Sequence, residues 1–432
     1  MKAISQGRRP RRFFRQLLAR STLRKLLILL VLWFVVEAQL IYYRVARAEH
    51  EYRSHASVEL QLESLENHIN VPEKPPRFFL ASLHWNNERI LRSNWNQQVL
   101  DLVDKLGPDN VFVSVYEGGS WDDTKGALRE LDAKLEKTGV AKQITLDKAT
   151  HADVMAEQPE PGNGWVQMPD GETKLRRIPY LSRLRNLSLK PLLDMAENGT
   201  TFDYVLFLGD VVFTVGDVIA LLNTNHGNFA AACSIDFSKP PLYYDTFALR
   251  DSGGHETATQ TWPYFRSHKS RKAMLYGAPV PVRSCWNGLV AMPTFAFTGT
   301  NGLKFRGIPD SLAQHHLEGS ECCLIHADNP ASRTRGVFLN PTVRVGYNKE
   351  AYEKVHPEGG NKIWLSTFGV YTGIWKSRLA RWFSSPWLKE QFVRGRIHTW
   401  ETEAPDENRE EPGEFCLINE MQVIVENGWK HL

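Results

Sequence analysis

The sequence predicts an α/β protein with an N-terminal membrane-spanning helix and a helical C-terminal extension. Three observations support this: short apolar strand segments alternate with amphipathic segments from residue 77 onward, one long apolar run follows a basic N-terminus, and few strand patterns occur after about residue 349. The 432 residues are 42% hydrophobic and 23% charged, which excludes a disordered chain.

The charge distribution argues against nucleic-acid binding. The formal net charge is +3, but residues 1–25 contain nine Lys or Arg and no acid. The remainder contains 43 basic and 49 acidic residues and is therefore net acidic. A nucleic-acid-binding domain needs its basic residues clustered on the folded part, whereas here they lie in the tail.

The segment 26–43 has the length and composition of a transmembrane signal anchor. It is mostly apolar, about one bilayer thickness long, and its basic flank of residues 1–25 predicts a cytosolic N-terminus. Glu37 is costly in lipid unless it has a partner or lies near the membrane exit. A cleaved signal peptide ending at Ala46-Arg47-Ala48, or a buried core helix, would be alternative interpretations.

Polar residues 44–76, which end in a Pro-rich stretch, are expected to form a stem before the folded domain of residues 77–432. Two sequons, at Asn186 and Asn198, are compatible with secretion. The five cysteines match no zinc-site spacing and could form one or two disulfides, with at least one left unpaired: Cys233, Cys285, Cys322, Cys323 and Cys416.

The folded domain begins with strand–helix alternation. Residues 77–83 form a short apolar run before a helix-like segment, and residues 110–116 are β-branched and almost continuously apolar, as expected for a strand covered on both faces. Residues 122–137 then have a helical pattern. Ligands of such sheets bind beyond the carboxyl ends of the strands.

The strand predicted at 202–208 is the most informative, because Gly209 and Asp210 follow it directly. A helix is expected before it, from about Tyr180 to Asn198, and the breaker-rich residues 155–172 are expected to form a loop near a site. A carboxylate at the end of a buried strand is placed to hold a divalent cation. Asp210 could equally be a helix cap or turn residue.

Further strands are predicted at 229–235, 289–292 and 336–347, and residues 349–432 are expected to be mostly helical with an acidic loop. The sequence contains no P-loop, no dinucleotide-binding glycine motif, no G-x-S-x-G elbow and no H-E-x-x-H. The common NTPase, dehydrogenase, esterase and zinc-protease classes are therefore unsupported.

We next consider an enzyme that breaks a sugar–diphosphate bond. Such an enzyme uses a cation between the two phosphates, and basic groups beside them, to stabilise the charge of the leaving group. Asp210 is the first candidate metal ligand, and the segment 319–328 offers Glu321 and His326. Carboxylate oxygens suit Mg²⁺ or Mn²⁺, and an imidazole favours Mn²⁺. His326 could instead be a buried, hydrogen-bonded histidine, and Arg185 either a solvated helix charge or a bidentate phosphate ligand.

Six segments in order give the chain a specific resemblance to the fungal α-1,3-mannosyltransferase family, relatives of the capsule-associated proteins. They are ASLHWNN at 81–87, YLSRLRNLSLKP at 180–191, FLGDVVF at 207–213, YDTFALRD at 244–251, SCWNG at 284–288 and SECCL at 320–324. The resemblance covers roughly residues 77–350. It implies a GT-A (Rossmann-like) fold, GDP-mannose as donor, Mn²⁺ with Mg²⁺ as an alternative, and retaining transfer to the 3-hydroxyl of a mannose acceptor.

The resemblance also implies the metal and donor residues. Asp210 falls on the last position of the Asp-x-Asp metal motif, whereas Leu208 replaces its first acid. His326 matches the place where many such enzymes supply a histidine ligand. Arg185 resembles the helix arginine that reaches the donor phosphates, and Asn87 lies in the loop that lines the nucleotide.

The remaining roles concern the sugars. Glu321 resembles the acid near the transferred sugar, and Asp251 is expected beside it as a second catalytic residue. Trp286 and Asn287 are expected to line the acceptor side. The sequence identifies no carboxylate as a covalent nucleophile, so attack on the same face as the leaving phosphate is favoured.

Together these features predict a Golgi single-pass type II membrane mannosyltransferase with a lumenal catalytic domain. A second hypothesis is a membrane-tethered glycan-binding or assembly protein that has lost activity, which the missing first acid of the metal motif favours. A third keeps the enzyme but replaces GDP-mannose with another nucleotide sugar.

Overall fold

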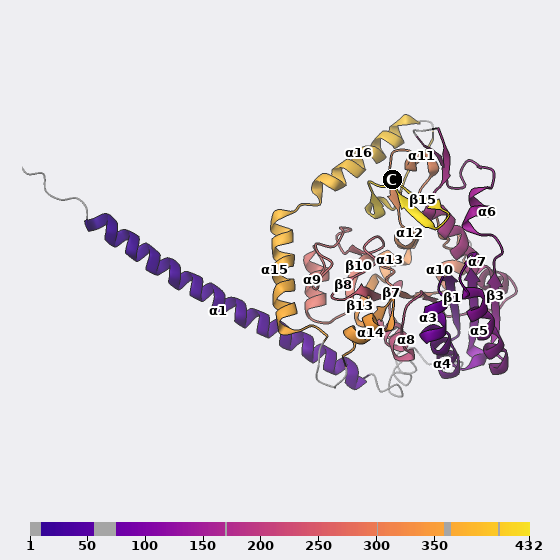
Figure 1. Cartoon of the computed structure of the whole chain (residues 1–432), viewed down its shortest axis with the longest axis horizontal. Coiled ribbons are helices and arrows are strands. Elements are labelled where there is room, and N and C mark those ends of the chain that lie inside the picture. Colours follow the sequence, from indigo (N-terminus) through magenta and orange to yellow (C-terminus); the bar gives the residue numbers. More distant parts are fainter. Residues whose placement is uncertain (1–9, 56–74, 169–170, 300, 358–363, 405–406) are drawn as a thin grey trace, which may run out of the picture.

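The computed structural model describes residues 10–55, 75–168, 171–299, 301–357, 364–404 and 407–432. Helix α1 (Pro10–His55) is continuous and extends away from the folded domain (Figure 1). Among the described residues, one stretch, Ser21–Arg47 within α1, is long and apolar enough to cross a membrane. The helix also includes residues 44–55, the first part of the expected stem, whereas residues 56–74 lie outside the described part.

A 10-stranded sheet forms the centre of the domain, in the order β3-β2-β1-β6-β11-β7-β13-β10-β9, with β8 paired to β7. Strands β3, β2, β1 and β6 are parallel, β11 is antiparallel to both β6 and β7, and β13 is parallel to β7. The strands are β1 (Phe78–His84), β2 (Val111–Glu117), β3 (Ala141–Leu146), β6 (Tyr204–Leu208), β7 (Ala231–Lys239), β8 (Leu242–Tyr243), β9 (Arg250–Asp251), β10 (Val280–Ser284), β11 (Leu289–Pro293) and β13 (Val337–Gly346).

Helices cover both faces of this sheet, as its near-continuously apolar strands require. On one face Phe79 packs with Leu189 and Leu192 of α7 (Arg177–Glu197), and on the other Phe78 and Leu80 pack with helices α4, α5 and α8. The other helices are α3 (Glu88–Ile90), α4 (Asn96–Leu106), α5 (Thr124–Thr138), α6 (His151–Met155), α8 (Val215–Leu222), α9 (His268–Leu275), α10 (Phe295–Thr298), α11 (Asp310–Ala313), α12 (Glu321–Asp328), α13 (Ala331–Thr334), α14 (Lys349–Val355), α15 (Thr367–Phe383) and α16 (Trp387–Glu403).

The predicted α/β fold is confirmed, and each predicted strand has a counterpart in the sheet. The breaker-rich loop 155–172 contains a short strand, β4 (Trp165–Gln167), which pairs with β5 (Thr173–Leu175). The C-terminal region is helical in α15 and α16, but it ends in β14 (Leu417–Ile418) and a hairpin of β15 (Gln422–Val425) and β16 (Gly428–His431). Strand β14 pairs with β12 (Glu318–Gly319).

Two disulfides fasten this arrangement, and one cysteine is unpaired, as expected. Cys233 of β7 is bonded to Cys285 in the β10–β11 loop, and Cys323 of α12 is bonded to Cys416 just before β14. The free cysteine is Cys322, which is buried. Each bond ties a loop or terminal segment to the body of the domain.

Candidate active site

A cavity of about 440 Å³ lies beyond the carboxyl ends of β1 and β6, where the parallel part of the sheet meets the antiparallel β11. Helix α7, the start of α12 and the C-terminal hairpin complete its walls. Its polar lining includes Asp210, Asp245, Glu321, Arg177, Arg185 and His431. The cavity therefore collects carboxylates, guanidinium groups and an imidazole at the sheet edge where α/β proteins bind ligands.

Asp210 lines this cavity immediately after β6. The Nδ2 of Asn87 donates to Oδ2 of Asp210 over 3.1 Å. Burial raises the pKa of Asp210, while hydrogen bonds, including that from Asn87, and the charge of Arg185 act in the opposite direction. Asp210 is half-buried and lines the cavity, and a partly desolvated carboxylate of this kind favours a cation as partner.

Gly209 fixes the position of Asp210. Its N–H donates to the carbonyl of Gly288 over 2.8 Å, and its carbonyl accepts from Nε1 of Trp95 over 3.0 Å. A Cβ at residue 209 would lie only 2.6 Å from the Gly288 oxygen, so only glycine allows this close approach of β6 and the β11 loop.

Arg185 and Glu321 form an ion pair in the cavity wall. Nε of Arg185 donates to Oε1 of Glu321 over 3.0 Å, and the Glu321 side chain is 4% exposed. The guanidinium also lies over the ring of Trp286, 5.0 Å from its centroid. Ser320 caps α12 through its side-chain oxygen and thereby positions Glu321 at the first turn.

Asp245 is a cavity carboxylate that the sequence analysis did not select, although it lies in the quoted segment 244–251. Its side chain accepts from the N–H groups of Phe247 and Ala248. Behind it, burial and the Asp245 charge raise the pKa of Asp236 to about 6, although Asn287 and Tyr347 donate to that carboxylate. The pair concentrates negative charge beside the cavity.

The C-terminal hairpin supplies a second group that the sequence analysis missed. Gln422, Trp429 and His431 line the cavity. Arg177 of α7 holds the hairpin in place, since its Nη1 donates to Gln422 over 2.7 Å and its guanidinium lies 3.9 Å from the Trp429 ring centroid. His431 also contacts Glu420. The sequence analysis assigned these residues to a mostly helical extension and gave them no role in the site.

The loop residues Trp286 and Asn287 differ in position. Trp286 lines the cavity, whereas Asn287 is fully buried and donates through Nδ2 to Asp236 and to the Asp245 carbonyl. Asn287 thus holds the loop rather than facing the cavity. Asn87 likewise acts through its hydrogen bond to Asp210 and is not among the cavity-lining residues.

The structure places Asp251 outside the cavity lining. It is fully buried in β9, and its carboxylate accepts from the N–H groups of Gly253, His255 and Ser267. Through these three hydrogen bonds the Asp251 carboxylate holds the loop that follows β9 in place. We therefore leave Asp251 out of the proposed catalytic residues.

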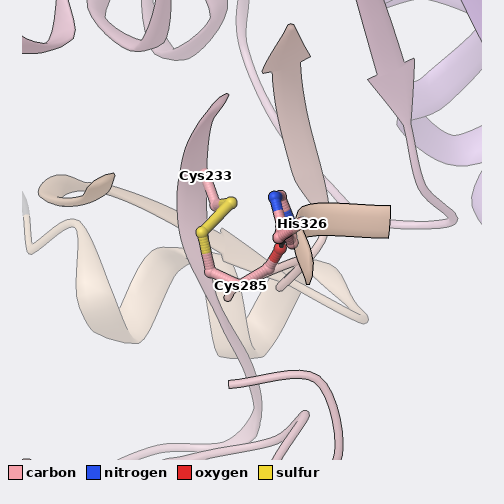
Figure 2. A group of neighbouring side chains, drawn as sticks. All are labelled: Cys233, Cys285 and His326. Carbon is pink, nitrogen blue, oxygen red and sulfur yellow. Dashed lines mark hydrogen bonds between the residues drawn. A yellow bond between two sulfur atoms is a disulfide. The ribbon is translucent and has the colours of Figure 1, made fainter. Parts of the chain in front are cut away.

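His326 also lies outside the cavity lining. Its Nε2–H donates to the carbonyl of Cys285 over 2.7 Å, and burial lowers its pKa to about 4. It lies beside the sulfurs of Cys233 and Cys285, which are bonded to each other and are not free thiolates (Figure 2). Among the cavity-lining residues the imidazole is that of His431, so we leave His326 out of the proposed metal ligands.

A match to a protein-family model identifies the chain as a glycosyltransferase. Residues 77–328 match the family model described as cryptococcal mannosyltransferase 1. The match covers more than half of the chain, and the chain belongs to this family. Among curated proteins no sequence match was found.

Solved glycosyltransferase structures are only distantly similar to the chain. Mannosyltransferase PcManGT from Pyrobaculum calidifontis, in complex with GDP-Man and Mn²⁺, is 11% identical, with a TM-score of 0.35 over 86% of this chain and 89% of its own. TarS 1-349 from S. aureus is 12% identical, with a TM-score of 0.32 over 62% and 60%. GalNAc-T7 with UDP, GalNAc and Mn²⁺ is 11% identical, with a TM-score of 0.34 over 64% and 44%.

Proposed function

We propose that the protein is a retaining α-1,3-mannosyltransferase that moves mannose from GDP-mannose to the 3-hydroxyl of an α-mannose glycan acceptor. One observation carries the proposal: Asp210 and the Arg185–Glu321 pair line a single cavity at the strand ends of a chain from a mannosyltransferase family. A diphosphate needs both a cation site and guanidinium groups, and this cavity offers both.

The donor set of the cavity fits a hard divalent cation. Asp210, Asp245 and Glu321 offer carboxylate oxygens, and His431 offers an imidazole. We propose Asp210 as the principal ligand, with His431 as the candidate histidine, and Mn²⁺ as the preferred ion over Mg²⁺. When bound, the ion would neutralise charge that develops on the departing diphosphate.

The guanidinium groups of Arg185 and Arg177 are the proposed contacts of the donor phosphates. Asn87 positions Asp210, and Glu321, held by Arg185, orients the transferred sugar. Trp286 supplies an apolar ring for the acceptor sugar. Arg185 thus connects the phosphate and the sugar ends of the site.

The proposed reaction occurs on one face of the sugar. The acceptor O3 forms a bond to C1 of mannose as the bond from C1 to the phosphate oxygen breaks, and the O3 proton passes to the departing phosphate of GDP. Glu321 is already bonded to Arg185, which suits an orienting role rather than that of a covalent nucleophile. The cavity residues contribute by positioning the reactants and stabilising charge.

We further propose that α1 anchors the protein as a single-pass type II Golgi membrane protein, with the domain in the lumen. Nine basic residues precede the apolar stretch and support a cytosolic N-terminus. The two disulfides support an oxidising compartment for the domain.

A screen of nucleotide sugars tests the function. The detergent-solubilised full chain is incubated with each donor and a mannose disaccharide, with and without Mn²⁺, and GDP release and product linkage are measured. We expect GDP-mannose alone to support transfer, and only with the ion. Glycan binding without any donor turnover would instead support the glycan-binding alternative, which Leu208, in place of the first acid of the metal motif, favours.

A further inference from the structure

Helices α15 and α16 carry an aromatic face for which the described part of the chain provides no cover. Six large apolar side chains on these two helices are more than half exposed: Phe368, Trp382, Phe383, Trp387, Leu388 and Phe392. Exposed fractions reach 84% at Phe383 and 71% at Leu388. Soluble surfaces rarely expose so many large apolar side chains on two successive helices without a partner.

Helices α15 and α16 lie on the side of the domain from which α1 extends (Figure 1). Helix α1 packs directly against α15, with the rings of Phe34 and Trp375 4.2 Å apart between centroids. Arg378 of α15 pairs with Glu37, the one acid in the apolar stretch of α1. If α1 spans a bilayer, these contacts hold α15 at the same bilayer.

Basic groups accompany the aromatic face. Burial, together with the like charges of Arg271, Arg378 and Arg266, lowers the pKa of Arg381 of α15 to about 10. Arg266 donates to the carbonyl and hydroxyl of Ser384, in the turn between α15 and α16. A group of four guanidinium groups suits anions such as lipid phosphates.

We propose that the α15–α16 face is a second membrane-contact surface, which enters the leaflet on the domain side of α1 from its lipid–water interface to the depth set by the contacts with Phe34 and Glu37. Tryptophan, phenylalanine and arginine together are typical of this interface, where rings enter the acyl boundary and cations meet phosphates. The proposal rests on the proposed membrane anchor. The surface would hold the domain in a fixed orientation against the membrane.

Fluorescence of a dye at defined positions tests this. Phe383→Cys and Leu388→Cys are each made in the full chain, labelled with an NBD dye and reconstituted in vesicles of phosphatidylcholine with phosphatidylserine, with or without doxyl-labelled lipids. Lys137→Cys is the matched control, because Lys137 is exposed on α5 at the opposite side of the domain. The unsubstituted chain, whose free Cys322 is buried, gives the labelling background.

We expect dyes at residues 383 and 388 to emit at shorter wavelength and to be quenched by doxyl lipids several-fold more than the dye at residue 137. Equal, water-like emission at all three positions in a chain that floats with the vesicles overturns the proposal and leaves the anchor intact. A chain that does not float overturns both. Blue-shifted emission without lipid quenching would show that a protein partner or second copy covers this face, and it would also overturn the proposal. Unchanged unfolding temperatures confirm that the labelled variants are folded.

Discussion

The substitution Asp210→Asn separates the proposed role of this residue from its place in the fold. The amide has the shape of the carboxylate, and its oxygen can still accept the hydrogen bond from Nδ2 of Asn87, which spans 3.1 Å in the native protein. We therefore expect the free energy of unfolding of the metal-free protein to change by less than about 1 kcal/mol.

The effect on catalysis should be far larger. Without the charge the cavity loses its principal cation ligand, and we expect transfer from GDP-mannose to fall at least about 10³-fold, which corresponds to about 4 kcal/mol in the barrier. Binding of the ion also predicts a change in protein stability, which can be measured without any turnover. An ion present at about 100 times its dissociation constant stabilises the native protein by about 2.7 kcal/mol, and this stabilisation should be absent from the variant.

Two assays check the prediction: GDP release at increasing Mn²⁺, and the unfolding temperature with and without Mn²⁺. Asp104→Asn is the control, since Asp104 is an exposed acid on α4 outside the cavity and should behave as the native chain in both. Native turnover by Asp210→Asn, or an undiminished thermal shift with Mn²⁺, would remove Asp210 from the metal site.

Arg185→Leu should lower the free energy of unfolding by about 3 kcal/mol, because it leaves the buried Glu321 carboxylate without its cation. The double variant Arg185→Leu/Glu321→Leu should recover most of this loss in urea titrations. Absence of any recovery would refute the stabilising ion pair. Cys416→Ser opens a disulfide whose cysteines are 93 residues apart and should lower the free energy of unfolding by about 4–5 kcal/mol, with Cys323→Ser giving the same loss. His326→Gln should retain Mn²⁺-dependent transfer. Burial lowers the pKa of His326 to about 4, so the histidine of the unfolded chain is protonated first as the pH falls. The native protein therefore loses stability between pH 6.5 and pH 4, by at most about 3 kcal/mol. His326→Gln should lack this pH-dependent loss, and an equal dependence of its unfolding free energy on pH would contradict the prediction.

The parallel half of the fold could be predicted because its physical signal is local. Residues 110–116 and 202–208 are apolar on both faces, a pattern that is typical of a central strand covered on both sides. They correspond to strands β2 and β6 of the sheet. The edge strand β3 escaped prediction, since Ala141–Leu146 mixes exposed and half-buried residues and has no such run. The C-terminal hairpin escaped for another reason. Its strands are four residues long and depend on packing against α7.

The candidate site was predictable only where a residue directly follows a strong element. Asp210 comes after a buried strand, and its position in the cavity follows from that strand alone. Asp251 and Asp245 share one segment, and both carboxylates accept from main-chain N–H groups. Only Asp245 lines the cavity, and nothing local indicates this difference. Residue His431 reaches the cavity from more than 200 residues away in sequence, and only the tertiary fold brings it there.

Both disulfides act on segments that line the cavity, which connects the chemistry of the site to the compartment in which it forms. The bond from Cys233 to Cys285 fastens the loop that carries Trp286, and the bond from Cys323 to Cys416 ties the residue two positions after Glu321 to the segment leading into the C-terminal hairpin. Trp286 also packs against the rings of Phe207 and Phe305, and the covalent ties add to the order that such contacts give the cavity walls. Such bonds persist in an oxidising compartment and are reduced in the cytosol. If α1 anchors the domain as proposed, these cavity walls would therefore be completed only after the domain reaches the lumen.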